Sequence, residues 1–168
     1  MSGRVIVGVD GSETARKAVR WAAREAKLRG MKLELVSAWE IPIYSYASRY
    51  GFPAISEEMM KSLTARAEGH LAEALDEARA EARDVEIETI AAEGQPAKVL
   101  VEIAKGADLL VVGSRGLGGF RELLLGSVSQ QCAQHATCPV VMVRHLEKGP
   151  EQPGRQGLWY PPASTTAV

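Results

Sequence analysis

The sequence predicts an α/β fold: a single domain with a doubly wound, five-stranded parallel sheet in the strand order 3-2-1-4-5. Three observations lead to the prediction of a doubly wound α/β sheet, and the order 3-2-1-4-5 is the one we assume for it. Short apolar runs rich in β-branched residues, typical of buried parallel strands, alternate with longer segments of helical periodicity. Right-handed crossovers between such strands place helices on both faces of one sheet. The chain of 168 residues also has the length of one domain with a self-sufficient core.

The first strand spans Arg4 to Val9, a nearly continuous apolar run that stops at Asp10-Gly11-Ser12. From Glu13 to Arg29, alanines recur at three- and four-residue spacing with basic residues between them. This pattern predicts an amphipathic helix that ends at Gly30. Because the basic residues lie opposite the alanines, we expect a solvated face rather than a docking stripe.

The second strand spans Lys32 to Ala38 and is followed by a long connection over residues 40–56. Loops longer than about 12 to 15 residues in compact domains are usually functional or disordered. Four aromatic residues lie in this one, namely Tyr44, Tyr46, Tyr50 and Phe52. The sequence leaves two alternatives open, a lid or partner surface over the sheet edge and a flexible surface insertion.

The remaining elements continue the alternation of helix and strand. They are a helix from Glu57 to Arg83, a strand from Val85 to Ala92, a helix from Ala97 to Lys105 that follows Pro96, a strand from Ala107 to Val112, a helix from Ser127 to His135 and a strand from Pro139 to Arg144. His70 has no potential metal ligand beside it at suitable spacing, so we expect a packed or surface side chain. Residues 1–146 form the predicted domain, and the proline- and glycine-rich residues 147–168 a predicted disordered tail.

A glycine-rich segment follows the fourth strand. Gly113-Ser114-Arg115-Gly116 begins where that strand ends, and after nine residues Gly126-Ser127-Val128-Ser129 opens a helix. Glycine lets a ligand approach the main chain closely, and the free amides and positive dipole end of a helix attract phosphate. The alternative is a tight turn and an ordinary helix start, and the residues alone leave the two equally open.

The predicted topology brings Asp10 and Gly113 together. Ligands of open α/β sheets bind outside the carboxyl ends of the strands, where the strand order reverses. In the order 3-2-1-4-5 that point lies between the first and fourth strands, which end at Asp10 and Gly113. The Asp10 carboxylate can accept hydrogen bonds from ribose hydroxyls or help to hold Mg²⁺. Capping of the first helix is the simpler role, and the two roles are compatible.

Composition excludes several classes of function. The formal net charge is −1, whereas proteins that bind nucleic acids usually carry a net positive charge, so we expect no nucleic-acid binding. No apolar run approaches the about 20 residues of a membrane helix, and the N-terminus begins a strand instead of a signal segment, so we expect a cytoplasmic protein that binds no membrane. Cys132 and Cys138 fit neither a Cys-x-x-Cys motif nor a zinc knuckle, so we expect reduced, partly buried thiols. A Walker loop is absent from the sequence.

The motif Gly-x-x-Gly-(nine residues)-Gly-Ser resembles the nucleotide motif of the universal stress protein family, with its fixed positions filled by Gly113, Gly116, Gly126 and Ser127. The resemblance extends over Arg4 to Arg144. It includes three further blocks: Val9-Asp10-Gly11-Ser12, Gly94-Gln95-Pro96 and Cys138-Pro139-Val140-Val141-Met142-Val143. It implies a Rossmann-like fold related to the adenine nucleotide alpha hydrolases, with ATP bound in the crevice.

The resemblance also implies roles for single residues. Val9, Asp10 and Ser12 would flank adenosine, and the main chain at Ala38 would meet the adenine edge. Ribose and phosphates would be held by Gly113, Arg115, Gly116, Gly126, Ser127, Val128 and Ser129, of which Arg115 is not a fixed motif position. Members of the family tend to pair their last strands in homodimers, and Val140 to Val143 would otherwise expose an apolar sheet edge.

The expected function is that of a cytoplasmic ATP-binding regulator or sensor of the stress response, working through an unidentified protein partner. At most slow hydrolysis is expected, because the sequence has no evident residue to position an attacking water and no evident arginine finger. Two alternatives remain: a slow ATPase or nucleotidyl-transfer enzyme on the same fold, and a nucleotide-free dimeric interaction module.

Overall fold

The computed structural model describes residues 3–41, 56–116 and 125–144. They form a five-stranded sheet with the order β3-β2-β1-β4-β5, in which every pair of neighbouring strands is parallel. The predicted fold class and strand order are thereby confirmed. Most of the predicted connection 40–56 and the whole predicted tail 147–168 lie outside the described residues, so both predictions about them stay predictions.

The first βαβ unit follows the sequence pattern closely. It consists of β1 (Arg4–Gly8), α1 (Glu13–Arg29) and β2 (Lys32–Trp39). The hydroxyl of Ser12 caps α1 by accepting a hydrogen bond from the Ala15 N–H, and Gly30 ends the helix with a φ of 65°. That left-handed conformation is readily available only to glycine, which is why the helix ends there.

The other elements are α2 (Glu57–Glu81), β3 (Ile87–Glu93), α3 (Pro96–Ile103), β4 (Leu109–Gly113), α4 (Ser127–His135) and β5 (Val140–Val143). Two strands, β3 and β4, begin two residues later than their apolar patterns predict. Val85 belongs to a turn, in which its N–H bonds to the carbonyl of Ala82 at 3.3 Å. Before β4, Ala107 likewise bonds to the carbonyl of Ala104 at 3.0 Å, so it still belongs to the turn after α3.

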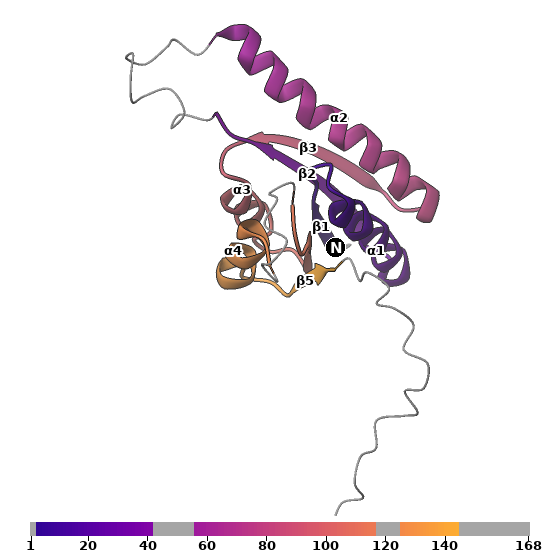
Figure 1. Ribbon diagram of the computed structural model, residues 1–168. Coiled ribbons are helices and arrows are strands. Elements are labelled where there is room, and N and C mark those ends of the chain that lie inside the picture. The colour runs from indigo at the N-terminus through magenta and orange to yellow at the C-terminus, as the bar shows by residue number, and fades with distance from the viewer. Residues whose placement is uncertain (1–2, 42–55, 117–124, 145–168) are drawn as a thin grey trace, which may run out of the picture.

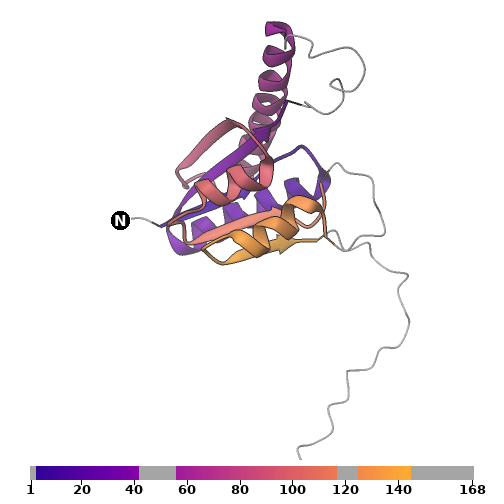
Figure 2. The same ribbon diagram turned by 90° about the vertical axis from the view of Figure 1, so that its left-hand side faces the viewer.

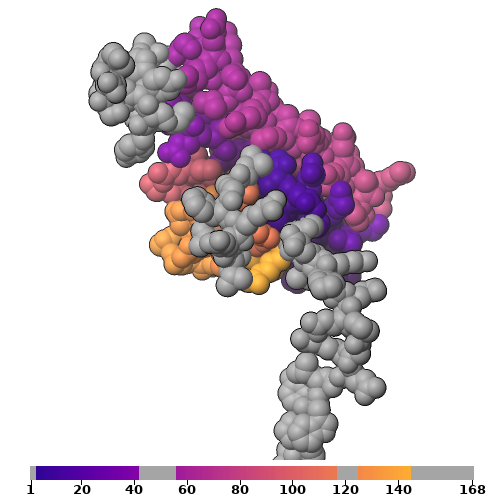
Figure 3. Space-filling view, in the orientation of Figure 1, coloured from indigo at the N-terminus to yellow at the C-terminus, as the bar shows by residue number. Residues whose placement is uncertain are grey.

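The sheet separates two helical layers. Figure 1 shows α1 and α2 on one face and α3 and α4 on the other, and Figure 2 views the molecule from the side on which α3 and α4 lie in front of the strands. Successive strand residues point to opposite faces, so one strand supplies both cores. In β1, Val5 and Val7 pack with α1 and α2, whereas Ile6 packs with α3 and α4. The space-filling view shows the long α2 forming one side of the molecule (Figure 3).

A cluster of charged residues, Arg4, Lys32 and Glu34, stabilises the end of the sheet at which β1 begins. The guanidinium of Arg4 lies 3.2 Å from the carboxylate of Glu34, which is 2% exposed, and it also donates to the carbonyls of Ile103 at 3.4 Å and Lys105 at 2.9 Å. Lys32 lies 2.9 Å from the same carboxylate. A buried carboxylate needs such partners, because removing an isolated charge from water is costly.

No helix in the described part of the chain is long and apolar enough to cross a membrane.

Candidate functional site

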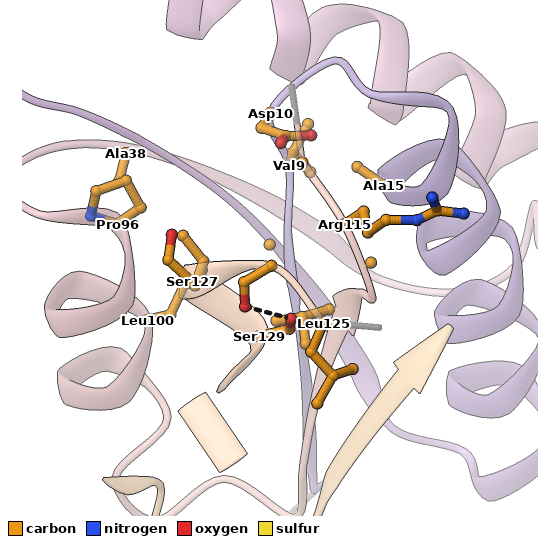
Figure 4. Close-up of a pocket in the computed structure, with 16 residues that line it drawn as sticks. Val9, Asp10, Ala15, Ala38, Pro96, Leu100, Arg115, Leu125, Ser127 and Ser129 are labelled. Atoms are coloured by element: carbon orange, nitrogen blue, oxygen red, sulfur yellow. Dashed lines mark hydrogen bonds between the residues drawn. The ribbon is translucent and has the colours of Figure 1, made fainter. Parts of the chain in front are cut away.

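A pocket of about 490 Å³ lies at the carboxyl ends of β1 and β4, where the strand order reverses (Figure 4). Its lining comes from β1 and the turn after it, α1, β2, α3, β4, the glycine-rich loop and α4. The lining residues are Gly8, Val9, Asp10, Ala15, Ala38, Pro96, Leu100, Val112, Gly113, Arg115, Gly116, Leu125, Gly126, Ser127, Val128 and Ser129. Clefts at such switch points are the usual ligand sites of open α/β sheets.

One end of the pocket is apolar. Ala38 at the end of β2 and Pro96 at the start of α3 lie side by side in Figure 4, with Leu100 one helical turn further along α3. Leu100 and Val9 are 4% and 7% exposed, so both belong to the core and to the pocket lining at once. These buried side chains form an apolar surface on which a planar ring of a ligand could pack.

Backbone groups of Ala38 add a polar edge to this apolar end. The register of β1 with β2 ends at the pair Gly8 and Val36, and the Val36 carbonyl accepts the N–H of Val9 at 2.8 Å. In a strand, the backbone groups of alternate residues face the same neighbour. The N–H and C=O of Ala38 therefore face the side on which β1 has already ended, which offers a ligand one donor and one acceptor.

Asp10 stands at the mouth of the other, polar end. One carboxylate oxygen, Oδ1, accepts the N–H of Ser12 at 2.9 Å, which fixes the side chain in the turn between β1 and α1. The other oxygen, Oδ2, lies 2.6 Å from the position that a Cβ atom on Gly116 would occupy. A side chain at position 116 would therefore displace the carboxylate, so glycine serves here for close approach rather than for an unusual φ.

The glycine-rich loop is held by α4 and β5. The Ser114 N–H donates to the carbonyl of Val143 at 2.8 Å, and the Ser114 carbonyl accepts the Gly126 N–H at 2.7 Å and the Ser129 hydroxyl at 3.0 Å. Ser114 and Ser129 are each 2% exposed. These bonds bring the start of the loop and the start of α4 together, although about a dozen residues separate them in the sequence.

The N-terminus of α4 opens into the same end of the pocket. Gly126 is its N-cap and makes no side-chain capping bond, so the amides of the first turn have no capping partner from that residue. Ser127, Val128 and Ser129 of this turn all line the pocket. A helix N-terminus with free amides and a positive dipole end favours anions, and phosphate above all.

The structure brings together almost all the residues that the sequence singles out. Ser12 is the exception: its hydroxyl caps α1, it is 8% exposed, and it does not line the pocket. Arg115 lines the pocket, but Figure 4 shows its side chain running along the α1 side, away from Ser127 and Ser129.

Sequence reasoning missed the contribution of α3. Pro96 and Leu100 line the pocket although they belong to no part of the glycine motif. The available signal was their spacing: residues four apart share one helix face, and a helix that begins with Pro96 directly after β3 starts at the ligand edge of the sheet. Gly8, Ala15, Val112 and Leu125 were also missed, and each directly adjoins or packs beside a predicted position.

Metal ligands are sparse at this site. Within residues 3–41, 56–116 and 125–144, no group of three or more His, Cys, Asp or Glu side chains could hold a metal ion. Asp10 is the acidic residue of the pocket lining. Mg²⁺ often binds through one carboxylate together with substrate phosphates and water, and the residues present fit that mode rather than an all-protein site.

The two cysteines lie away from the pocket lining, in and beside the core under α3 and α4. Both are free thiols, as the sequence predicts. Burial raises the pKa of Cys132 to about 11, and burial also raises the pKa of Cys138. Such thiols stay protonated and unreactive at neutral pH.

Comparison with known proteins agrees with this geometry. The family model described as "Universal stress protein family" matches residues 1–144. The chain is 33% identical over 148 residues to Universal stress protein YxiE of Bacillus subtilis, which covers 86% of this chain and 100% of YxiE. A universal stress protein solved in complex with cAMP is 32% identical, with a TM-score of 0.64 over 85% of this chain and 97% of that one. A family protein from Arabidopsis thaliana with AMP bound is 26% identical, with a TM-score of 0.59 over 86% and 92% of the two chains.

The sheet order and the loop at its switch point define a Rossmann-like α/β protein. Within that class, the family match and the identity to YxiE settle the assignment, and the chain belongs to the universal stress protein family. The resemblance noted in the sequence is thereby confirmed.

Proposed function

We propose that this protein binds ATP in the switch-point pocket and acts in the cytoplasm as a nucleotide-dependent regulator of the stress response. The observation that carries the proposal is the pocket itself, which joins an apolar slot with a backbone donor and acceptor at Ala38 to a polar end built from Asp10 and the α4 N-terminus. Related proteins solved with cAMP and with AMP support an adenine nucleotide as the class of ligand.

The apolar end suits adenine. The base would lie among Val9, Ala38, Pro96 and Leu100, with its Watson–Crick edge toward the backbone of Ala38. That edge carries one acceptor, N1, and one donor, the N6 amine, which match an N–H and a C=O on the same residue. Since the backbone reads the base, side-chain changes at position 38 that keep the volume small leave the preference for adenine intact.

The polar end suits ribose and phosphates. Asp10, which lines the pocket beside Gly116, would accept hydrogen bonds from ribose hydroxyls through Oδ2. The amides of Gly116 and of the first turn of α4 then surround the phosphates, and Mg²⁺ would be held mainly by phosphate oxygens and water, with Asp10 within its reach. More phosphate groups use more of these amides, which favours ATP over AMP.

Slow hydrolysis at most is proposed for this site. Phosphoryl transfer needs a residue to position the attacking water and a cation to offset charge in the transition state. Among the pocket residues that the structure describes, the one carboxylate is fixed by Ser12, and the Arg115 side chain lies on the α1 side. The protein would therefore act through the bound nucleotide rather than through turnover, and its readout would be a contact with a protein partner.

A homodimer through β5 is part of the proposal. The Pro139 carbonyl accepts the N–H of Leu110 in β4, and the Val143 carbonyl accepts the N–H of Ser114 directly after β4. The backbone groups of Val140 and Met142 therefore face the open edge of the sheet. An unpaired apolar edge is readily completed by a second copy. The test is Val140→Pro, which removes an outward donor and leaves the bonds to β4 in place. We expect this variant to be monomeric by analytical ultracentrifugation, and a dimer that persists in it would exclude pairing through β5.

The first test of nucleotide binding is to purify the protein without added nucleotide, denature it and identify what is released by mass spectrometry. Calorimetry with ATP, AMP, cAMP and GTP in Mg²⁺ then ranks the ligands, and we expect ATP to bind most tightly and GTP most weakly. Absence of binding to any of them would favour the nucleotide-free interaction module. Steady-state turnover well above about 1 per second would favour the ATPase or nucleotidyl-transfer alternative.

A further inference from the structure

The first turn of α1 holds the backbone of the glycine-rich loop through hydroxyl groups. Thr14 Oγ1 donates a hydrogen bond to the carbonyl oxygen of Arg115. Ser12 Oγ lies 3.5 Å from the same oxygen and 3.3 Å from Thr14 Oγ1. Thr14 and Ser12 are 7% and 8% exposed, so water competes little for these bonds. Two segments about a hundred residues apart in sequence are thus joined at one carbonyl.

The same helix turn also packs tightly against the start of the loop. A Cβ atom on Gly113 would lie 2.8 Å from Thr14 Oγ1 and 2.9 Å from the backbone nitrogen of Ala15. The approach is possible only because residue 113 is glycine. The hydrogen bond to Arg115 and this close packing are independent contacts, and together they fix the start of the loop, Gly113 to Arg115, against α1.

Holding the Arg115 carbonyl also sets the direction of the next amide. The C=O of residue 115 and the N–H of residue 116 belong to one planar trans peptide and point in opposite directions. Because the carbonyl points toward α1, the Gly116 N–H points away from α1. The Gly116 nitrogen lies 3.6 Å from the position of a Cβ on Gly126, the N-cap of α4. The Gly116 amide is therefore directed to the same end of the pocket as the first-turn amides of α4.

We propose that Thr14 is a positioning residue for phosphate recognition: its hydroxyl holds the peptide between Arg115 and Gly116 so that the Gly116 amide faces the phosphates. The proposal rests on the nucleotide-binding function proposed above and adds a residue that lies outside the glycine motif and outside the pocket lining. Thr14 itself does not touch the ligand.

Ser12 reinforces Thr14. The Ser12 hydroxyl accepts the Ala15 N–H at 3.2 Å, which leaves its own proton for Thr14 or for the Arg115 carbonyl. A chain of hydrogen bonds polarises each member and strengthens the last one. Threonine at position 14 also has fewer side-chain rotamers in a helix than serine, so its hydroxyl is better directed. The cap of α1 thus contributes to the orientation of the loop.

The test compares Thr14→Val, which keeps the shape and removes the hydroxyl, with Thr14→Ser, which restores it. Thr64→Val on α2 makes the same chemical change away from the pocket and serves as the matched control. Calorimetry measures the affinity of each variant for ATP and for adenosine. We expect Thr14→Val to weaken the binding of ATP by about tenfold, the value of the one charge-assisted hydrogen bond between the Gly116 amide and a phosphate. The affinity for adenosine should change less than twofold. Thr14→Ser should bind ATP within about threefold of the unaltered protein.

Equal losses for ATP and adenosine in Thr14→Val, or failure of Thr14→Ser to restore ATP binding, would show a general structural role and overturn the proposal. A second measurement needs no nucleotide: a crystal structure of ligand-free Thr14→Val should show the peptide between Arg115 and Gly116 rotated away from its present orientation. An unchanged peptide overturns the role of Thr14 whether or not nucleotide binds. Absence of any binding to the unaltered protein refutes the proposed function instead, so the two failures are distinguishable.

Discussion

Substitution of Gly116 by alanine offers the sharpest test of how the two ends of the pocket meet. The added Cβ would lie 2.6 Å from Asp10 Oδ2, closer than these atoms can pack. Backbone strain is no part of the effect, because Gly116 is not among the glycines with positive φ. The carboxylate must therefore move, and it then loses its bond to the Ser12 N–H, its proposed contact with ribose, or both.

The expected loss of ATP affinity follows from the proposed hydrogen bond between Asp10 and ribose. A hydrogen bond to a charged group contributes about 1.5–3 kcal/mol, which corresponds to roughly 10–100-fold in affinity. Calorimetry with ATP and Mg²⁺ measures the loss. Gly69→Ala is the matched control, because nothing lies within 4 Å of a Cβ at that position on α2. It should leave ATP binding unchanged and stabilise the helix by up to about 1 kcal/mol.

A double-mutant cycle isolates the cause. If Gly116→Ala acts by displacing Asp10, it should cost much less in a protein that already carries Asp10→Ala, because residues in contact are not additive. ATP affinity within twofold of the unaltered protein for Gly116→Ala would refute the argument. So would an equally large loss on both backgrounds, since the effect would then bypass the carboxylate.

Three further predictions concern stability and are measured by urea denaturation. Gly113→Ala forces a Cβ to within 2.9 Å of the α1 backbone and should lower the unfolding free energy by about 1–3 kcal/mol, more than Gly116→Ala does; equal costs would contradict the packing argument. Arg4→Met leaves the buried Glu34 carboxylate with Lys32 as its charged partner and should cost roughly 1–3 kcal/mol, part of which Glu34→Gln in the same background recovers. Burial raises the pKa of Cys132 from 9.0 to about 11, so the thiol of the unfolded chain deprotonates first and stability should fall as the pH rises between these values. Cys132→Ala should show a shallower fall over that range, and an identical slope would refute the assignment to this thiol.

The strands and the position of the glycine-rich segment could be predicted because they depend on local patterns. The apolar run before Gly113 marks a strand, and the glycines after it mark a place where backbone and ligand meet, whatever the details of packing. The contribution of Leu100 could not be obtained in this way. An apolar residue on α3 appears the same in sequence whether it faces the core or a pocket, and here it does both.

The role of Thr14 escaped sequence analysis for a related reason. A threonine in the first turn of a helix is ordinary, and its hydroxyl has no partner that local sequence can identify. The strand order brings α1 beside the loop after β4, but only the structure shows that the Thr14 hydroxyl reaches the Arg115 carbonyl. The resemblance places Ser12 among the ligand contacts, whereas in the structure its hydroxyl caps α1.

Glycine and small polar residues are frequent at this site because the backbone would contact the ligand while side chains orient that backbone. The groups that would contact base and phosphates are main-chain amides and carbonyls, as at Ala38, Gly116 and the start of α4, so side chains serve mainly to aim them. Amides held in advance lose little further freedom when a ligand binds, which improves affinity without any added contact. The backbone of Ser114 is oriented in this way: its carbonyl accepts the Ser129 hydroxyl of α4, and its N–H donates to the Val143 carbonyl of β5. One hydrogen bond therefore joins the start of the glycine-rich loop to the last residue of β5, the strand through which we propose that the protein dimerises.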